Sequence, residues 1–175
     1  MISLENISSR IGDEIFFTRL NNSFEIGRIH GIWNETDRFN RYFLQILTGH
    51  IPLSSGIIRY EGEKLDHANV VYYNRSDMAG LDFTNGPSQY RSNNKFIYLF
   101  DNIFSSLDIA SVVLLYRTIL PLKAMGSTIL ITSTDYKALR ASTDFFHIFS
   151  QGAFQAKLHV KQYELLDRVF MHLQR

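Results

Sequence analysis

The sequence contains no cysteine and almost no excess of charge. The absence of cysteine excludes a disulfide framework, a thiolate metal site and a cysteine nucleophile, and it fits a reducing compartment. The 18 Lys and Arg residues nearly balance the 17 Asp and Glu residues, which leaves a net charge of +1. Without a basic excess the chain lacks the electrostatic signature of a polyanion binder, so we expect no nucleic-acid partner.

Long hydrophobic runs are also missing. Apolar runs such as residues 111–116 are far shorter than the ~18 residues that a membrane-spanning helix needs. The first residues, MISLEN, lack the basic start and the apolar centre of a secretory signal peptide. We therefore expect a cytoplasmic protein, which reaches the periphery of a membrane only when a partner holds it there.

Residue patterns for metal binding and for hydrolysis are absent as well. No pair among the six histidines has a metal-ligand spacing such as His-Glu-x-x-His, and the Gly-x-Ser-x-Gly motif of serine hydrolases does not occur. We expect no metal and no other cofactor. A single histidine in an apolar strand, such as His147, is expected to be a hydrogen-bonded residue of the core or its rim.

What the sequence does contain is the size and composition of one folded domain. It has 175 residues, of which 45% are hydrophobic and 14% aromatic. A chain of this length buries roughly 70% of the surface that its unfolded form exposes, which is enough for a core. We predict a single domain over residues 1–175.

The first part of the chain predicts antiparallel strands followed by a strand, a turn and a helix. Residues 2–30 alternate apolar and polar side chains in pieces, as strands with one solvated face do. Residues 29–33 then form an apolar strand pattern. Three good N-cap residues come next, namely Asn34, Thr36 and Asp37. Apolar residues at helical spacing follow them: Phe39, Tyr42, Phe43, Ile46 and Leu47.

The rest of the chain predicts a mostly parallel sheet flanked by helices, so the fold class is α/β. The expected strands cover residues 57–60, 70–73, 96–100, 127–132 and 145–149. The last three are continuous apolar runs, which suit strands buried on both faces. Helical patterns cover residues 108–120, 136–141 and 160–174. Residues 74–95 are polar and rich in Gly, Pro, Asn and Ser, which predicts a surface loop.

Three segments in this order resemble the ATP-binding domain of ABC transporters. Residues 27–49 resemble its strand, Walker A phosphate-binding loop and helix. Residues 96–108 resemble the Walker B strand and the D-loop, with Asp101 at the Mg²⁺-organising aspartate and Asp108 at the end of the D-loop. Residues 128–152 resemble the switch strand and the last core strand. The resemblance covers about residues 1–153 and implies a P-loop NTPase-like fold.

The Walker A chemistry of that family is replaced in this chain. There, glycines let backbone N–H groups surround the phosphates, a lysine neutralises them and Ser or Thr holds Mg²⁺. The resemblance places the glycine positions on Asn34, Asp37 and Phe39, the lysine position on Asn40, and the Ser and Thr positions on Arg41 and Tyr42. Glu35 and Asp37 also put negative charge where a polyphosphate would lie.

Other functional positions of the family differ too. The catalytic glutamate position is Asn102, the switch histidine position is Thr134 and the Q-loop glutamine position is Asn74. The aromatic residue that stacks on adenine falls at Ile11, with Phe16 and Phe17 nearby. Residues 74–95 stand where the family inserts a helical subdomain with its signature motif.

These replacements imply a catalytically inactive ABC-ATPase-like protein, with no catalytic residue and only vestigial nucleotide positions. Such a protein would act as a scaffold or regulatory subunit through protein contacts. The expected partners are an active ABC-type ATPase, a membrane transport subunit or a second copy of the chain. Two alternatives remain: an ABC-type subunit with residual nucleotide binding or slow ATP hydrolysis through Asp101, and a module with a new ligand in the old nucleotide cleft.

Overall fold

The computed structural model describes residues 1–74, 96–106, 109–166 and 168. An antiparallel sheet has the strand order β2-β1-β4-β5. Its strands are β1 (Ile2–Ile11), β2 (Glu14–Phe24), β4 (Ser55–Tyr60) and β5 (Glu63–Lys64). Register shifts in β1, between Leu4 and Arg10, mark bulges in this sheet.

A second sheet has the strand order β10-β9-β3-β8-β7-β6, and its strands are parallel except β10. Its strands are β3 (Ile29–Trp33), β6 (Val70–Tyr73), β7 (Ile97–Phe100), β8 (Thr128–Ser133), β9 (Phe145–Ser150) and β10 (Ala153–His159). The α-helices are α1 (Asp37–Leu47), α3 (Ile109–Ala124) and α4 (Tyr136–Ser142). Short 3₁₀ turns are η1 (His67–Asn69), η3 (Ile103–Ser106) and η4 (Val160–Leu165).

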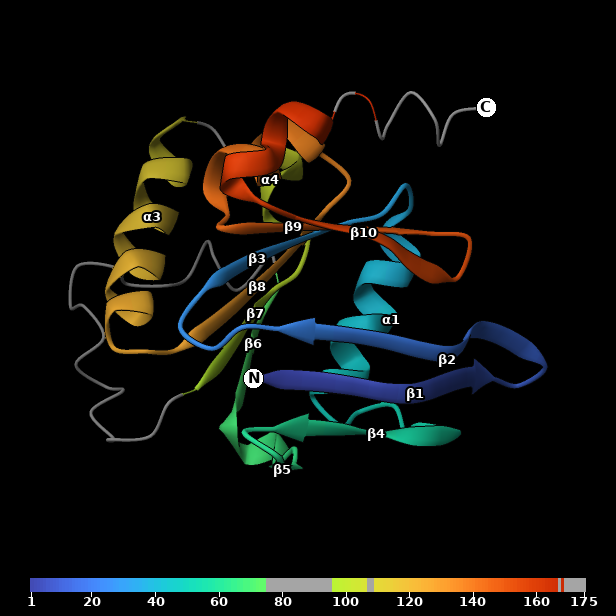
Figure 1. Ribbon diagram of the computed structural model, residues 1–175. Helices are drawn as coiled ribbons and strands as arrows, with labels where there is room; N and C mark the ends of the chain where they lie inside the picture. The colour runs from blue at the N-terminus through green and yellow to red at the C-terminus, as the bar shows by residue number, and fades with distance from the viewer. Residues whose placement is uncertain (75–95, 107–108, 167, 169–175) are drawn as a thin grey trace.

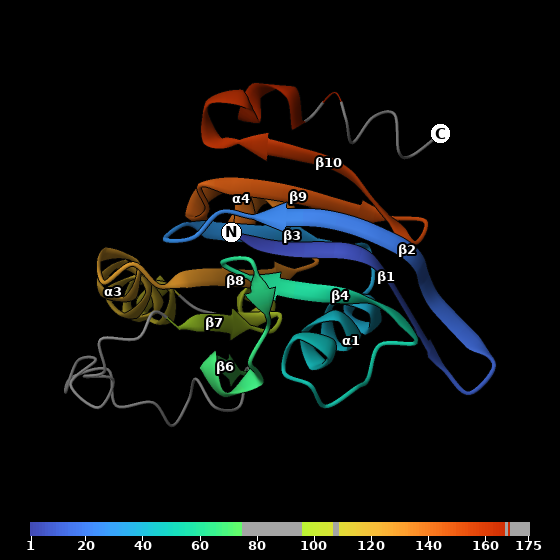
Figure 2. The same cartoon turned by 60° about the horizontal axis from the view of Figure 1, so that its bottom comes forward.

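The elements stack in layers, with α1 between the two sheets and α3, α4 and η4 on the other face of the parallel sheet (Figures 1 and 2). The inner core joins Phe43 of α1 to Ile2 and Phe24 of the antiparallel sheet and to Ile32 and Leu99 of the parallel sheet. All five of these side chains are completely buried. The outer core packs α3, α4 and η4 on the opposite face through Leu115, Ile119, Leu139 and Tyr163.

Gly49 ends α1, as a glycine after the last turn of a helix commonly does. Its φ of +78° lies in the left-handed region, and its N–H donates to Ile46 O at 3.0 Å. A Cβ at this position would lie 2.7 Å from His67 Cδ2. The backbone conformation and the approach of His67 therefore both favour glycine here.

The structure confirms the α/β class, the antiparallel part and the mostly parallel sheet flanked by helices. It corrects three details. Strand β10 follows β9 and was not predicted; residues 160–165 form a 3₁₀ helix where an α-helix over 160–174 was expected. Helix α3 also continues past Pro121 to Ala124. The predicted loop at 74–95, apart from Asn74, and the D-loop residue Asp108 lie outside the described residues.

Among the described residues, no helix is long and apolar enough to cross a membrane.

Candidate functional site

The positions that the resemblance singles out gather at one edge of the parallel sheet. Asn34 follows β3, Asp101 follows β7 and Thr134 follows β8. Because β3, β8 and β7 are neighbouring parallel strands, their carboxyl ends meet at the same edge. Helix α1 begins at this edge as well. Ligands of open α/β sheets bind outside the carboxyl ends of the strands, so this edge is the candidate site.

Side-chain hydrogen bonds build the turn between β3 and α1. The Asn34 Oδ1 atom accepts from Thr36 N at 2.8 Å and from Thr36 Oγ1 at 3.0 Å, and Asn34 Nδ2 donates to Phe149 O at 2.9 Å. Thr36 is the N-cap residue but its side chain makes no capping bond, which corrects the expected capped start. None of residues 34–42 has a positive φ. An anion-binding nest needs alternating right- and left-handed residues, so this turn forms none.

Asn40, at the lysine position, is part of the core. Its side chain is 0% exposed, and neither Oδ1 nor Nδ2 has a hydrogen-bond partner among the described residues. A buried, neutral amide cannot neutralise the charge of a phosphate as a lysine would. It also carries the desolvation cost of unpaired polar atoms, about 1–3 kcal/mol.

Asp101 is the centre of a polar network at the end of β7. Its Oδ2 accepts from the Tyr72 hydroxyl at 2.8 Å and lies 3.8 Å from Arg41 Nε, and its Oδ1 lies 3.3 Å from Thr132 Oγ1. Asp101 is only 7% exposed. Side-chain hydroxyls and Arg41 therefore stabilise this carboxylate.

The remaining predicted positions take structural roles. The Asn102 N–H donates to Thr132 Oγ1 at 3.2 Å, and Asn102 has a φ of +46°. The Thr134 carbonyl accepts from Trp33 Nε1 at 2.9 Å. Asn74 follows β6, the edge strand of the parallel sheet. The structure thus joins Arg41, Asp101 and Asn102 through one network, and it gives Thr134 a contact of its own.

No pattern in the sequence indicated Tyr72 as a partner of Asp101. The contact depends on the register of β6 against β7, which pairs Tyr72 with Leu99 and Tyr73 with Phe100. That pairing places the Tyr72 side chain beside the residue that follows β7. Only the knowledge that β6 pairs with β7, across residues 74–96, would have revealed the contact between Tyr72 and Asp101.

A cavity of about 440 Å³ opens beside the start of α1, between β2 and the β9–β10 turn. Phe16, Thr36 and Arg38 are among the residues that line it. Phe16 packs on Tyr42 with ring centroids 4.1 Å apart, and the Arg38 guanidinium lies 5.3 Å from the Phe16 centroid and pairs with Glu14. Of the aromatic candidates, Phe16 lies at the cavity, whereas Phe17 is buried in the core.

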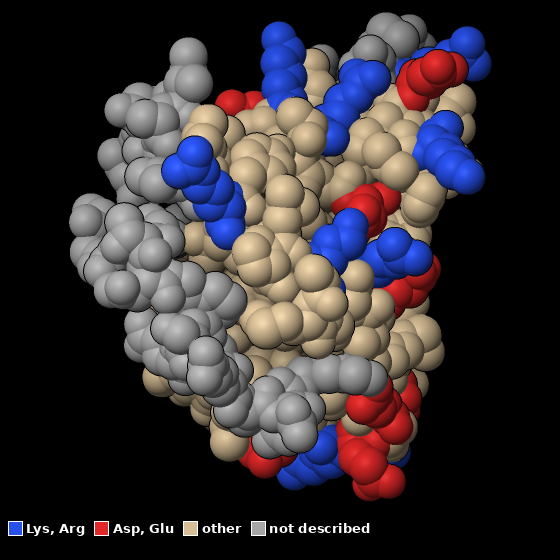
Figure 3. Space-filling view, turned by 90° about the vertical axis from the view of Figure 1, so that its left-hand side faces the viewer, with Lys and Arg blue, Asp and Glu red and all other residues tan. Residues whose placement is uncertain are grey.

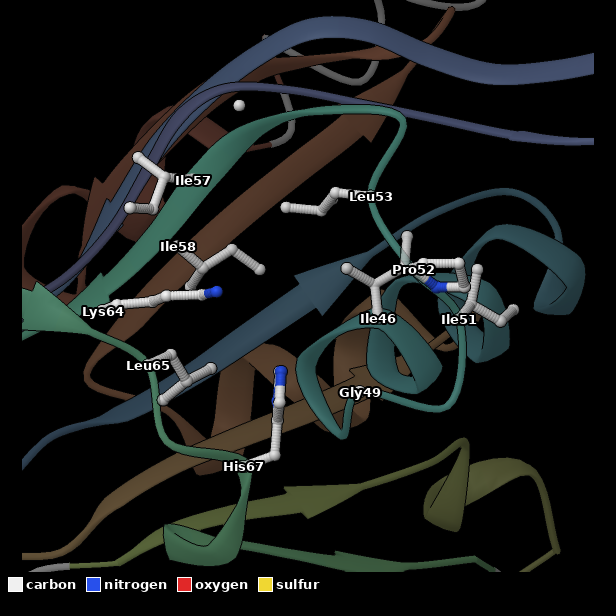
Figure 4. A pocket seen from close by; sticks show the side chains of 11 residues that line it. Ile46, Gly49, Ile51, Pro52, Leu53, Ile57, Ile58, Lys64, Leu65 and His67 are labelled. Atoms are coloured by element: carbon white, nitrogen blue, oxygen red, sulfur yellow. The ribbon is translucent and has the colours of Figure 1, made fainter.

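A second cavity, of about 380 Å³, lies between the end of α1 and strands β4 and β5 (Figure 4). Its walls are mostly aliphatic, and Lys64 and His67 are its basic members. The His67 Nδ1–H donates to Leu47 O at 2.9 Å, which fixes this ring at the end of α1. Within the described residues, no three His, Asp or Glu side chains form a group that could hold a metal ion.

The candidate site does not fit Mg²⁺-bound ATP. The turn before α1 lacks a backbone nest, the lysine position is a buried amide, and the oxygen atoms of Asp101 are occupied by Tyr72 and Thr132. Arg41, at the Ser position, replaces a hydroxyl ligand of Mg²⁺ by a cation. No step of phosphate chemistry follows from this arrangement.

The fold nevertheless has close counterparts among solved structures. No protein-family model matches the sequence, and no curated protein matches it significantly. An ATP-binding subunit of an ABC transporter superposes with a TM-score of 0.76 at 15% identity, over 100% of both chains. The cbiO1 protein of Clostridium perfringens, part of the ABC transporter complex cbiONQ, gives 0.73 at 13% identity, over 98% of this chain and 93% of that one.

A nucleotide-free ATP-binding cassette from an ABC transporter gives a TM-score of 0.75 at 12% identity, over 98% of this chain and 95% of that one. At such identities the likeness concerns the fold alone. The chain therefore has the P-loop NTPase fold of the ATP-binding subunits of ABC transporters.

Proposed function

We propose that this chain is a catalytically inactive ABC-ATPase-like protein that acts as a scaffold or regulatory subunit through protein contacts. The observation that carries the proposal is the start of α1. Its turn is closed by Asn34 and Thr36 side chains, has no positive φ and offers no cation at Asn40. A phosphate-binding start of the same helix would present backbone N–H groups and a lysine.

We expect a loss of catalysis because the chain lacks both the cation that would stabilise the phosphoryl group and the base that would accept a proton from water. Electrostatic stabilisation of the transferring phosphoryl group provides most of the rate enhancement in such enzymes. The chain has no lysine at residue 40, and the position of the general base is the amide Asn102. A general base typically contributes 10²–10⁴-fold, and an amide cannot accept the proton.

The surface of α3 supports a function through protein contacts. Val113 and Leu120 of α3 are 46% and 52% exposed, and Met125, which follows the helix, is 49% exposed. Val113 and Leu120 lie two helical turns apart on one side of α3, with the exposed Arg117 between them. The face of the molecule on this side has a broad uncharged area with Lys and Arg side chains around its upper part (Figure 3). We take this side of α3, on which two exposed apolar residues flank a cation, as the surface that a partner contacts.

The fold supports the partner class that we expect. A structural neighbour is part of an ABC transporter complex, so we expect a membrane transport subunit or an active ABC-type ATPase, with a second copy of the chain as a further candidate. Such a partner would hold the protein at the periphery of the membrane. The proposal covers residues 1–175 as one domain.

Co-expression with a multi-span membrane protein or an intact ABC ATPase encoded beside it tests the proposal. We expect co-purification in detergent and no phosphate release by the isolated chain. Leu120→Glu should reduce co-purification at least tenfold, whereas Lys137→Glu on α4 should leave it unchanged. Mg²⁺-dependent phosphate release that Asp101→Ala abolishes would contradict the proposal.

The cavity at the start of α1 favours one alternative, residual nucleotide binding. Its 440 Å³ lie beside Phe16, an aromatic ring, and Arg38, a cation. Nucleotide that co-purifies with the chain, and is lost when Phe16 is replaced by alanine, would support this alternative over the scaffold.

A further inference from the structure

Two histidines meet inside the parallel sheet. His30 lies on β3 and His147 on β9, the neighbouring parallel strand, and both side chains are 0% exposed. His30 Nδ1 and His147 Nε2 are 3.0 Å apart. The chain of contacts continues on both sides, to Glu25 O from His30 Nε2 at 2.9 Å and to Asn22 Nδ2 from His147 Nδ1 at 3.1 Å.

The partners at the two ends fix the protons on both rings. The Glu25 carbonyl only accepts, so His30 Nε2 carries a proton, and the neutral ring then accepts at Nδ1. His147 Nε2 must therefore donate to His30 Nδ1, which leaves His147 Nδ1 as the acceptor for the Asn22 amide N–H. The network is complete only when both rings are neutral.

Aromatic rings pack around the histidine pair. Phe24 of β2 lies 5.3 Å from His30 and 4.8 Å from His147, measured between ring centroids. Phe145 stacks on His30 at 5.2 Å, and Phe154 of β10 lies 5.9 Å from His147. A cation at either ring would be surrounded by groups that solvate it poorly.

The charged groups around the pair are engaged elsewhere. Lys157 of β10 pairs with Glu25 and donates to Ser23 O. Asp144, before β9, pairs with Lys123. The other charged or titratable groups nearby are Arg28, before β3, and His159, whose ring packs on Phe145. No carboxylate among the described residues contacts either ring of the pair to stabilise a cation there.

We propose that the His30–His147 pair, with Asn22, is an acid-sensitive latch between β2 of the antiparallel sheet and strands β3 and β9 of the parallel sheet. A proton on His30 Nδ1 would place two N–H groups against each other. A proton on His147 Nδ1 would place its N–H against the N–H of the Asn22 amide, unless that side-chain amide flips to present its oxygen. Either proton breaks or reverses one link and leaves a cation among phenylalanine rings.

The pKa values of the two rings give the direction of the effect. Burial lowers the pKa of His30 to about 4, although the bond to the Glu25 carbonyl opposes this. Burial, then the proximity of His30 and Lys157, lowers the pKa of His147 well below its ordinary value. In the unfolded chain both rings titrate near 6.5. The unfolded state therefore binds more protons between pH 6.5 and the folded pKa values, and stability falls as the pH decreases through this window.

Denaturant unfolding between pH 7.5 and 5.5 tests the latch. Unfolding of the natural chain should take up close to two protons at pH 5.5, so its unfolding constant should rise up to about 100-fold per pH unit. The double variant His30→Gln and His147→Gln should lose this rise. The exposed His50→Gln variant should keep it. An unchanged rise in the double variant would overturn the proposal.

Nitrogen–proton NMR of the two imidazole rings decides the matter if the double variant does not fold. We expect both rings to keep the neutral Nε2–H form in the folded chain at pH 5.5. A doubly protonated ring at His30 or His147 in the folded chain at that pH would overturn the proposal. The nearby Asp144 does not account for a loss of stability between pH 7.5 and 5.5. Burial alone would raise the pKa of Asp144, but hydrogen bonds from the Ile29 N–H and from Lys123 lower it. The stability that the ionised Asp144 contributes is therefore lost only in stronger acid.

Discussion

At the scale of single residues, Asn34 and Asn40 show how differently the same amide behaves in one site. Asn34 is 7% exposed and uses both ends of its side chain, bonding Thr36 and Phe149. Asn40 is 0% exposed, and its amide has no partner among the described residues. Only the first amide repays its loss of water with hydrogen bonds.

Asn40→Leu should therefore stabilise the protein. Leucine has a similar shape and removes two unpaired polar atoms, whose burial costs about 1–3 kcal/mol. Each kcal/mol corresponds to roughly 2–4 °C in a chain of this size, so the midpoint of thermal unfolding should rise by several degrees. Asn34→Leu is the matched control and should lower the midpoint. A fall of similar size in both variants would show that Asn40 has partners in solution.

At the scale of elements, the antiparallel sheet depends on one close approach of two backbones. Gly56 of β4 has a φ of +85°, and a Cβ there would lie 2.4 Å from Asn6 O. Asn6 lies in the part of β1 where the pairing with β4 shifts register. The bulge in β1 and the glycine in β4 therefore accommodate each other.

Gly56→Ala should destabilise the protein more than Gly62→Ala. Gly62 also has a positive φ, of +93°, but a Cβ there would meet nothing within 4 Å. Its replacement carries only the left-handed conformation cost of about 1–2 kcal/mol. At Gly56 the backbone of β1 must move as well, so the loss measured by denaturant unfolding should exceed that value. Equal losses would mean that β1 yields without cost.

At the scale of the whole molecule, the two cores make the fold independent of a ligand. The inner core around α1 and the outer core under α3 each contain continuous buried side chains from several elements. The turn before α1 is held by the two bonds from Thr36 to Asn34 Oδ1, which are made without any ligand.

The midpoint of thermal unfolding should therefore not change with ATP, ADP or GTP, with or without Mg²⁺. A nucleotide present at 100 times its dissociation constant would add about 2.7 kcal/mol by linkage. That corresponds to a rise of several degrees. A saturable rise of this size, abolished by Asp101→Ala or by Thr36→Trp, would contradict the scaffold proposal and favour residual nucleotide binding.

The local pattern of the sequence determined most of the elements. Hydrophobic alternation marked β1 and β2, continuous apolar runs marked β7, β8 and β9, and helical spacing marked α1, because these periods follow from backbone geometry alone. Strand β10 was missed, and η4 was expected to be an α-helix. Both depend on tertiary packing: β10 is an edge strand that pairs with β9, and Tyr163 of η4 bonds Thr143.

The contacts of the candidate site came from the tertiary structure. The resemblance singled out Asn34, Asn40 and Asp101 in the sequence, but Tyr72 reaches Asp101 only through the register of β6 on β7. His30 and His147 are 117 residues apart in the sequence and meet because β3 and β9 are neighbours. Local periodicity determines which segments are strands or helices, whereas the order of strands in a sheet is a global outcome of burial, and that order decided which side chains meet.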